Sequence, residues 1–135
     1  MPVRSLSSPV LKWPDRDTVL EAVSSWSKEA AEAHPEVEAL ALYGSYARGD
    51  WGVGSDVDLL ALVSSSDTLF ERRSLAWDLG SLPVPGQLVI YTREEWEGLR
   101  ERGARIVRTV EDEGIWLRGA PSRAGRLPDD PPTAP

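Results

Sequence analysis

Residues 39–63, ALALYGSYARGDWGVGSDVDLLALV, contain two apolar runs separated by a glycine-rich segment. The runs 39–43 and 58–63 predict short buried strands, because each is continuous, apolar and bordered by turn residues. Asp56 and Asp58 lie at the beginning of the second run. Alternate side chains of a strand point the same way, so the two carboxylates share one face, about 7 Å apart along the backbone. The stretch therefore predicts a strand, a tight loop and a second strand that begins with two acids.

The residues around this loop predict a site for a metal ion and phosphate groups. Carboxylates at the mouth of a buried strand are unfavourable unless they are solvated, paired or metal-bound. Magnesium suits Asp56 and Asp58, because hard divalent cations prefer oxygen ligands and bind together with substrate phosphates. Gly44 and Ser45 form a turn whose backbone N–H groups and hydroxyl can donate to phosphate oxygens. Arg48 adds a planar cation directed toward the same oxygens.

Three motifs together resemble the signature of the polymerase-beta-type nucleotidyltransferase superfamily: Gly44-Ser45, Ala47-Arg48-Gly49 and Ser55-Asp56-Val57-Asp58-Leu59. The short chain is similar to the minimal nucleotidyltransferase branch, and the resemblance covers roughly residues 15–118. It implies an α/β fold in which a mixed sheet is flanked by helices. It also implies an enzyme that binds a nucleoside triphosphate, with ATP as the expected nucleotide, and two Mg²⁺ ions, for which Mn²⁺ can substitute. The implied reaction is transfer of a nucleoside monophosphate to an acceptor hydroxyl.

The resemblance further implies a protein partner. Minimal nucleotidyltransferases are often antitoxins of HEPN-domain toxins, some of which they inactivate by adenylylation. The expected acceptor is therefore a hydroxyl on a HEPN-type partner. An alternative function, neutralisation of the partner by occlusion alone, stays open. Assembly of the chain into a homo-oligomer stays open as well.

The 86–92 strand, GQLVIYT, departs from the family pattern. Family members usually carry a third carboxylate there, and Gln87 occupies the expected position. An amide is neutral and a poor proton acceptor. If the missing acid served only as general base, its loss lowers the rate by about 10^2- to 10^4-fold. The alternative function is a degenerate nucleotide-binding or partner-binding module with weak or no transfer. Five acids are conceivable substitutes, although the sequence places none of them in the site: Asp50, Asp67, Asp78, Glu94 and Glu95.

Composition limits the other functions that the chain can have. A net charge of −7 argues against a broad nucleic-acid surface, which needs clustered Lys and Arg. The arginines of the C-terminal half predict either a solvated helix face or a docking surface. No stretch has the length or apolar content of a membrane span or signal peptide, and cysteine is absent, which together favour a cytoplasmic protein. The single histidine, His34, excludes a histidine-based metal cluster.

The chain reads as one domain over residues 15–118, preceded by an irregular segment at 1–14 and followed by a Pro-rich disordered tail at 119–135. Asp15 or Asp17 caps a helix that runs to about residue 33 and ends before His34-Pro35. Six small or apolar residues of this helix recur at helical spacing and are expected to face the sheet: Val19, Ala22, Val23, Trp26, Ala30 and Ala33.

Further elements follow the two motif strands. A helix is predicted over about residues 68–79, with its apolar side packed down. Thr92 and Glu95 have the spacing of a capping box and predict another helix, which Gly103 ends. Beyond it a last helix is expected, and residues 115–117 are predicted either to add a short edge strand or simply to pack against the domain. Trp51, in the motif loop, is predicted to cover a nucleotide, to contact a partner or to pack against its own domain.

Overall fold

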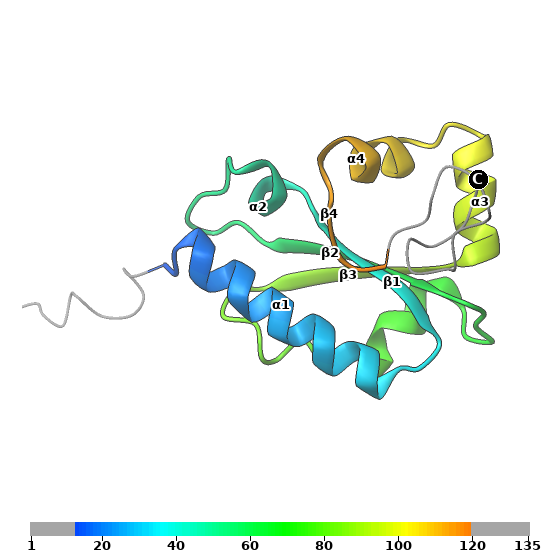
Figure 1. The fold of residues 1–135 in the computed structure, drawn as a ribbon, viewed down its shortest axis with the longest axis horizontal. Coiled ribbons are helices and arrows are strands. Elements are labelled where there is room, and N and C mark those ends of the chain that lie inside the picture. Colours follow the sequence, from blue (N-terminus) through cyan, green and yellow to red (C-terminus); the bar gives the residue numbers. More distant parts are fainter. Residues whose placement is uncertain (1–12, 120–135) are drawn as a thin grey trace, which may run out of the picture.

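The computed structural model describes residues 13–119 of the 135-residue chain. Figure 1 shows a mixed sheet flanked by helices, which confirms the predicted fold class. The predictions of an irregular segment at 1–14 and of a disordered tail at 119–135 lie outside the described residues, apart from the positions next to the domain. The elements in chain order are α1 (Arg16–Ala33), β1 (Val37–Tyr43), α2 (Ser45–Arg48), β2 (Val57–Val63), the 3-10 helix η2 (Phe70–Ala76), β3 (Gly86–Thr92), α3 (Arg93–Glu101), α4 (Arg105–Glu113) and β4 (Ile115–Arg118).

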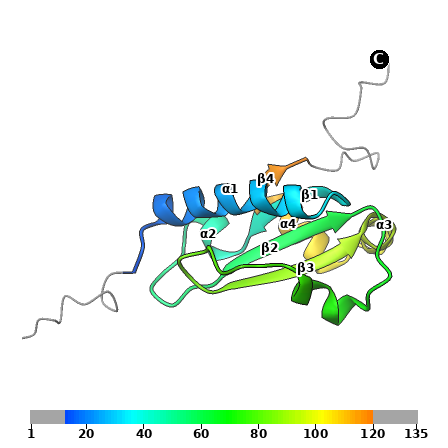
Figure 2. The same cartoon turned by 90° about the horizontal axis from the view of Figure 1, so that it is seen from below.

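The four strands are ordered β3-β2-β1-β4. β1 is antiparallel to both β2 and β4, and β2 is parallel to β3, so that β2 and β3 run side by side in the same direction (Figure 2). Consequently the last residue of β1 and the first residues of β2, β3 and β4 all lie at one end of the sheet. Every position that the sequence predicts for the site comes from this end.

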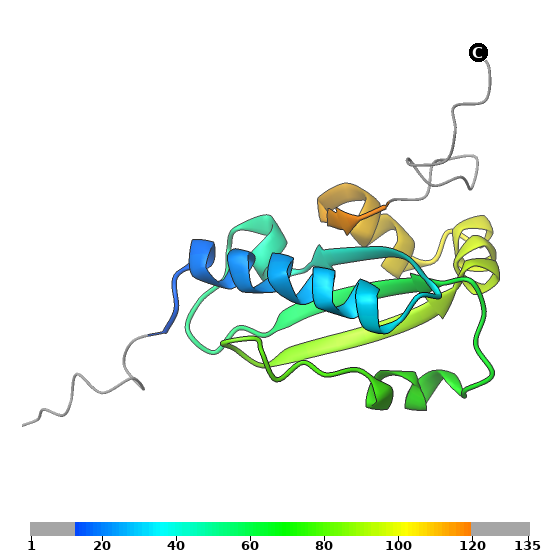
Figure 3. The same ribbon diagram turned by 60° about the horizontal axis from the view of Figure 1, so that its bottom comes forward.

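The core consists of two apolar layers, one on each face of the sheet. Buried residues of α1, including Val19, Val23 and Trp26, pack on one face, whereas Trp96 of α3 and Val107 and Val110 of α4 pack on the other (Figure 3). All residues of β2 except Asp58 are buried. This pattern confirms the prediction of a strand covered on both sides.

The helix ends follow the capping signals of the sequence. Asp15 caps α1 by accepting from the Thr18 N–H at 2.8 Å, and His34 ends that helix. Thr92 and Glu95 form the predicted capping box at the start of α3. β4 is the predicted edge strand. None of the described helices is both long and apolar enough to cross a bilayer.

The predicted helix over residues 68–79 is wrong. The segment contains only the short 3-10 helix η2, in which no residue is buried, and Leu69 and Leu75 are 67% and 74% exposed. A short helix is marginal without an apolar face packed on the domain, so the periodicity alone does not stabilise an α-helix here. The segment is instead attached through Arg73, which donates to the Thr68 and Ile90 carbonyls at 2.9 and 3.1 Å and pairs with Glu95 at 2.7 Å.

Candidate functional site

The two aspartates lie at the start of β2. Asp56 directly precedes the strand and Asp58 is its second residue, and both are half-buried. Asp58 is in register with Tyr43 of β1 and Gln87 of β3. The loop of residues 49–56 therefore reverses the chain direction, and both carboxylates lie beside the end of β1.

The electrostatics of this pair favour a bound cation. Burial raises the pKa of the Asp58 carboxyl, repulsion from Asp56 raises it further, and the nearby Arg48 opposes the shift. Burial, together with the Asp58 charge, also raises the pKa of Tyr43 to about 12. Both shifts show that negative charge is unfavourable here, and a cation bound between the carboxylates would relieve this cost.

Gly44 forms the turn between β1 and α2 and touches Asp58. Its φ of +83° belongs to the region that glycine adopts and other residues rarely do. A Cβ atom at this position would overlap Asp58 Oδ2, so a side chain is excluded by space as well as by conformation. The next residue, half-buried Ser45, begins α2. The predicted phosphate turn is therefore in contact with Asp58, one of the two predicted metal ligands.

Arg48 lies at the same turn, but carboxylates engage its guanidinium group. Its Nε donates to Asp50 Oδ2 at 3.1 Å and its Nη1 to Glu113 Oε2 at 3.0 Å. The same Glu113 oxygen accepts from the Gly44 N–H at 2.9 Å. Glu113 was not predicted from the sequence, because its position depends on the pairing of β4 with β1. The available signal was an acid directly before the Gly114 that separates α4 from the edge strand.

Gln87 lies where the third acid was expected. It is in register with Asp58 on the neighbouring strand, and its Nε2 donates to Asp56 Oδ2 at 3.2 Å. No substitute acid is brought into a third ligand position: among residues 13–119, no three acidic or histidine side chains are grouped closely enough to hold a metal ion. Asp50 pairs with Arg48, and Glu95 pairs with Arg73 beside η2. The strand positions of the site thus carry two carboxylates and an amide, and the Glu113 carboxylate lies at the adjoining turn.

Trp51 packs against its own domain. Its ring stacks on that of Tyr46, with centroids 5.4 Å apart and planes 9° apart. Tyr46 is fully buried; its hydroxyl accepts from Trp13 Nε1 at 2.8 Å and its carbonyl from Arg16 Nε at 2.8 Å. These contacts attach α2 and the motif loop to the beginning of α1.

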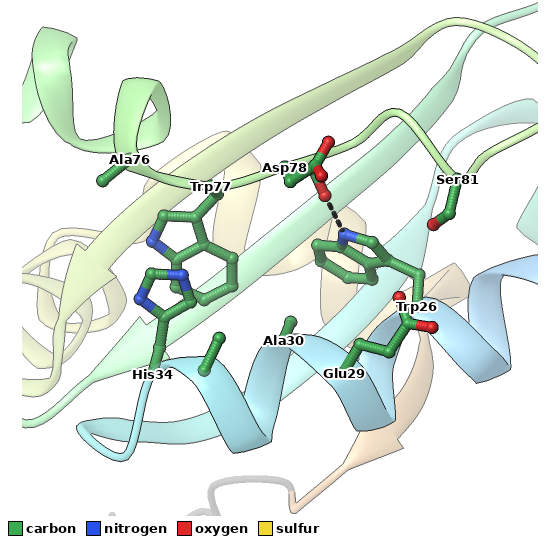
Figure 4. A pocket seen from close by; sticks show the side chains of 9 residues that line it. Trp26, Glu29, Ala30, His34, Ala76, Trp77, Asp78 and Ser81 are labelled. Carbon is green, nitrogen blue, oxygen red and sulfur yellow. Dashed lines mark hydrogen bonds between the residues drawn. The ribbon is translucent and has the colours of Figure 1, made fainter.

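A separate hollow of about 260 Å³ lies between the C-terminal half of α1 and the segment after η2 (Figure 4). Trp26 Nε1 donates to the Asp78 carbonyl at 3.0 Å, and His34 stacks on Trp77 with centroids 4.1 Å apart. The residues that line the hollow include neither aspartate of the site. The position of His34 agrees with the prediction of a helix-end residue.

The fold and the site define a class of protein. Residues 23–117 match the family described as nucleotidyltransferase domain, and the chain belongs to this family. The predicted resemblance is therefore confirmed, and a transferase is the enzyme class to which this family belongs.

The chain is also similar to individual proteins and solved structures. A protein of Methanocaldococcus jannaschii, provisionally named a protein adenylyltransferase, is 34% identical over 58 residues, which are 42% of this chain and 59% of that protein. The match thus spans less than two thirds of the curated relative. A solved structure from Sulfolobus solfataricus, provisionally described as a nucleotidyltransferase, has a TM-score of 0.53 at 19% identity and covers 75% of this chain and 80% of that one; it supports the fold. A toxin-antitoxin structure with AMP-PNP has a TM-score of 0.46 at 21% identity, with 72% and 73% coverage.

Proposed function

We propose that the chain is a magnesium-dependent nucleotidyltransferase that transfers AMP from ATP to a hydroxyl on a protein partner. The observation that carries this proposal is the contact between Gly44 and Asp58. This contact supports the proposal because a turn suited to phosphate oxygens lies against one of the two carboxylates proposed to hold the cation. A glycine turn or a pair of carboxylates alone is common. The two together at one end of the sheet fit a metal-bound triphosphate.

The side chains at this end of the sheet fit magnesium. Mg²⁺ is commonly held by one or two carboxylates together with substrate phosphates and water, so Asp56 and Asp58 would be sufficient protein ligands. The raised pKa of Asp58 agrees with this role, because burial and, after it, the charge of Asp56 disfavour the ionised carboxyl, which a cation would stabilise. When bound, the metal would neutralise charge that develops on the phosphate oxygens. Two ions, as the family resemblance implies, remain part of the proposal.

The residues of the turn would bind the part of the nucleotide that leaves. The Ser45 backbone N–H and hydroxyl would donate to the oxygens of the β- and γ-phosphates, while the Gly44 N–H stays bound to Glu113. Arg48 contributes by exchanging its Asp50 contact for a phosphate oxygen, since Asp50 is exposed and the exchange loses only a solvent-screened pair. The acceptor oxygen then bonds to the α-phosphorus, the bond to the bridging oxygen breaks, and pyrophosphate leaves. Gln87 cannot take the acceptor proton, which passes to water.

A protein acceptor agrees with the character of the chain. The described part of the chain forms one small domain, and the net charge of −7 disfavours a nucleic-acid acceptor. The relative from Methanocaldococcus jannaschii bears a name that assigns adenylyl transfer to protein. The family resemblance points further, to a HEPN-type toxin as the acceptor and to an antitoxin role for this chain.

Label transfer tests the proposal. The protein is incubated with α-labelled ATP, Mg²⁺ and a HEPN-type partner, and label on the partner is measured. We expect metal-dependent labelling that is lost in Asp56→Asn and retained in Asp67→Asn, which removes an exposed carboxylate elsewhere. Labelling that persists in Asp56→Asn would contradict the assigned site. Binding of ATP without labelling would retain the nucleotide site and reject transfer to this acceptor, as the second candidate function below predicts.

The hydrogen bond from Gln87 to Asp56 favours a second candidate, a nucleotide-binding module with little transfer. The amide occupies the neighbouring strand position without offering a base or a negative charge. This candidate predicts the same nucleotide affinity and no detectable label. Substitution of Gln87 by aspartate distinguishes this module from a transferase, because only a site that lacks an acid would gain transfer activity.

A further inference from the structure

Glu113 connects two groups of the candidate site that are separate in sequence. A single carboxylate oxygen, Oε2, accepts both from the Gly44 N–H at 2.9 Å and from Arg48 Nη1 at 3.0 Å. Figure 1 shows α2 close to the end of α4, where this contact forms, although the two helices pack on opposite faces of the sheet. The carboxylate thereby fixes the backbone of the turn and the direction of the cation relative to one another.

Helix stability does not account for an acid at this position. Glu113 is the last residue of α4, where the helix dipole disfavours negative charge. The last turn of α4 has no basic residue and also contains Glu111 and Asp112. Glu113 differs from these two exposed acids because its side chain is only 20% exposed and faces Gly44 and Arg48. Its charge is therefore stabilised by the turn and not by the helix.

The consequences reach the aspartates through Gly44. Because the Gly44 backbone touches Asp58, a shift of the turn changes the distance between the phosphate donors and the metal ligands. The end of α4 is closely packed: the Gly114 N–H donates to the Val110 carbonyl at 2.8 Å, a Cβ at Gly114 would overlap that carbonyl, and β4 begins at the next residue. Glu113 therefore connects the turn to the junction of α4 and β4.

We infer that Glu113 is a positioning residue for the nucleotide: by holding the Gly44 N–H and Arg48, it orients the turn so that the Ser45 donors and the guanidinium group of Arg48 meet the triphosphate beside Asp58. This inference rests on the proposed function. It predicts a change in ATP affinity opposite in sign to the change that charge alone predicts. Removing a negative charge near a triphosphate should strengthen binding if charge alone matters, whereas losing a positioning contact weakens it.

The test is a titration of the full chain with ATP and Mg²⁺, followed by calorimetry and by the amide resonances of Gly44 and Ser45. Glu113→Ala should raise the Kd for ATP about tenfold, as expected for loss of a hydrogen bond to a charged group. Glu113→Gln keeps an acceptor for the Gly44 N–H and should raise it only about threefold. Asp112→Asn removes the same charge from the same helix end and should leave the Kd within about twofold.

The nucleotide-free spectra provide an independent reading of the contact. The Gly44 amide proton should move upfield in Glu113→Ala, stay closer to the wild-type position in Glu113→Gln, and not move in Asp112→Asn. Equal or tighter ATP binding by Glu113→Ala, or the same weakening in Asp112→Asn, would overturn the inference while the proposed function stands. Failure of the wild-type protein to bind ATP would reject the proposed function, and the inference with it.

Discussion

Gly44 joins the two halves of the candidate site, and its substitution separates two physical effects. Gly44→Ala should destabilise the protein by about 2–4 kcal/mol. The alanine would have to adopt an unfavourable positive φ, and its Cβ would overlap Asp58. Gly49 has a φ of +95° but open space around its Cβ position, so Gly49→Ala should cost only about 1–2 kcal/mol. Gly52 has open space and no positive φ, and its alanine variant should be near neutral. Urea denaturation measures this order; equal losses at Gly44 and Gly49 would show that the Asp58 contact is unimportant.

Asp58 should make stability depend on pH in the absence of metal. Its pKa is raised above the ordinary value of 3.8 in the folded protein, so the folded state favours the neutral carboxyl. Its stabilising contribution is complete below that value and is lost as the pH rises through the raised pKa. Asp58→Asn lacks this loss, and in EDTA it should melt higher than the wild type by on the order of 1–3 °C at pH 7, with the difference shrinking toward pH 4. Thermal melts at both pH values test this, and a lower melting temperature for the variant at pH 7 would oppose it.

Substitution of Gln87 distinguishes a transferase from a nucleotide-binding module with little transfer. Gln87→Asp places a carboxylate in register with Asp58 and should raise the rate of label transfer by about 10^2-fold or more, if the absent acid is a general base. Glu94→Gln, at an exposed residue of α3, serves as the control for handling and folding. An unchanged rate in a folded Gln87→Asp protein would show that the amide does not limit transfer.

These residues differ in how far the sequence could predict their positions. Asp56, Asp58 and Gly44 belong to one strand-loop-strand segment, so local geometry brings them together and their spacing reveals it. Gln87 required the expectation of a family strand, and the parallel pairing of β2 and β3 places it beside Asp58. Glu113 depends on a contact between α4 and the end of β1, which no local pattern records.

At the scale of elements, η2 shows the limit of apolar periodicity. Arg73 attaches this segment to the domain in place of a packed apolar helix face. Its side chain is only 9% exposed and contacts two carbonyls and Glu95. Arg73→Ala should therefore destabilise the protein by about 1–3 kcal/mol. The exposed neighbour Arg72 is the matched control, and its alanine variant should change stability by less than about 0.5 kcal/mol. Urea denaturation that gives the same small change for both would mean that the segment is attached in another way.

Elements with strong end signals were predictable. The box at Thr92 and Glu95 and the break at Gly103 each depend on a backbone contact within a few residues, so the sequence alone specifies them. The cap of α1 was predicted at Asp15 or Asp17, and the structure has it at Asp15. The segment between β2 and β3 lacks such a signal. Its conformation is set by tertiary contacts, and the sequence pattern could not supply them.

At the scale of the whole molecule, strand order creates the site. One antiparallel hairpin, one parallel neighbour and one edge strand bring Gly44, Asp58, Gln87 and the residue before β4 to the same end of the sheet. A metal-bound triphosphate placed there would lie at the edge of the domain, accessible to an acceptor on another protein. This arrangement agrees with a small transferase that depends on its partner to present the hydroxyl.

Calorimetric titration with ATP tests the central claim most directly, because it asks whether the turn and the aspartates form one metal-dependent nucleotide site. The wild-type protein should bind ATP in a saturable manner with Mg²⁺, and at least about tenfold more weakly in EDTA. Asp58→Asn should lose the same factor in Mg²⁺, whereas Asp67→Asn should match the wild type. ATP binding that is indifferent to both Mg²⁺ and Asp58, or no binding by the wild-type protein, would contradict the claim.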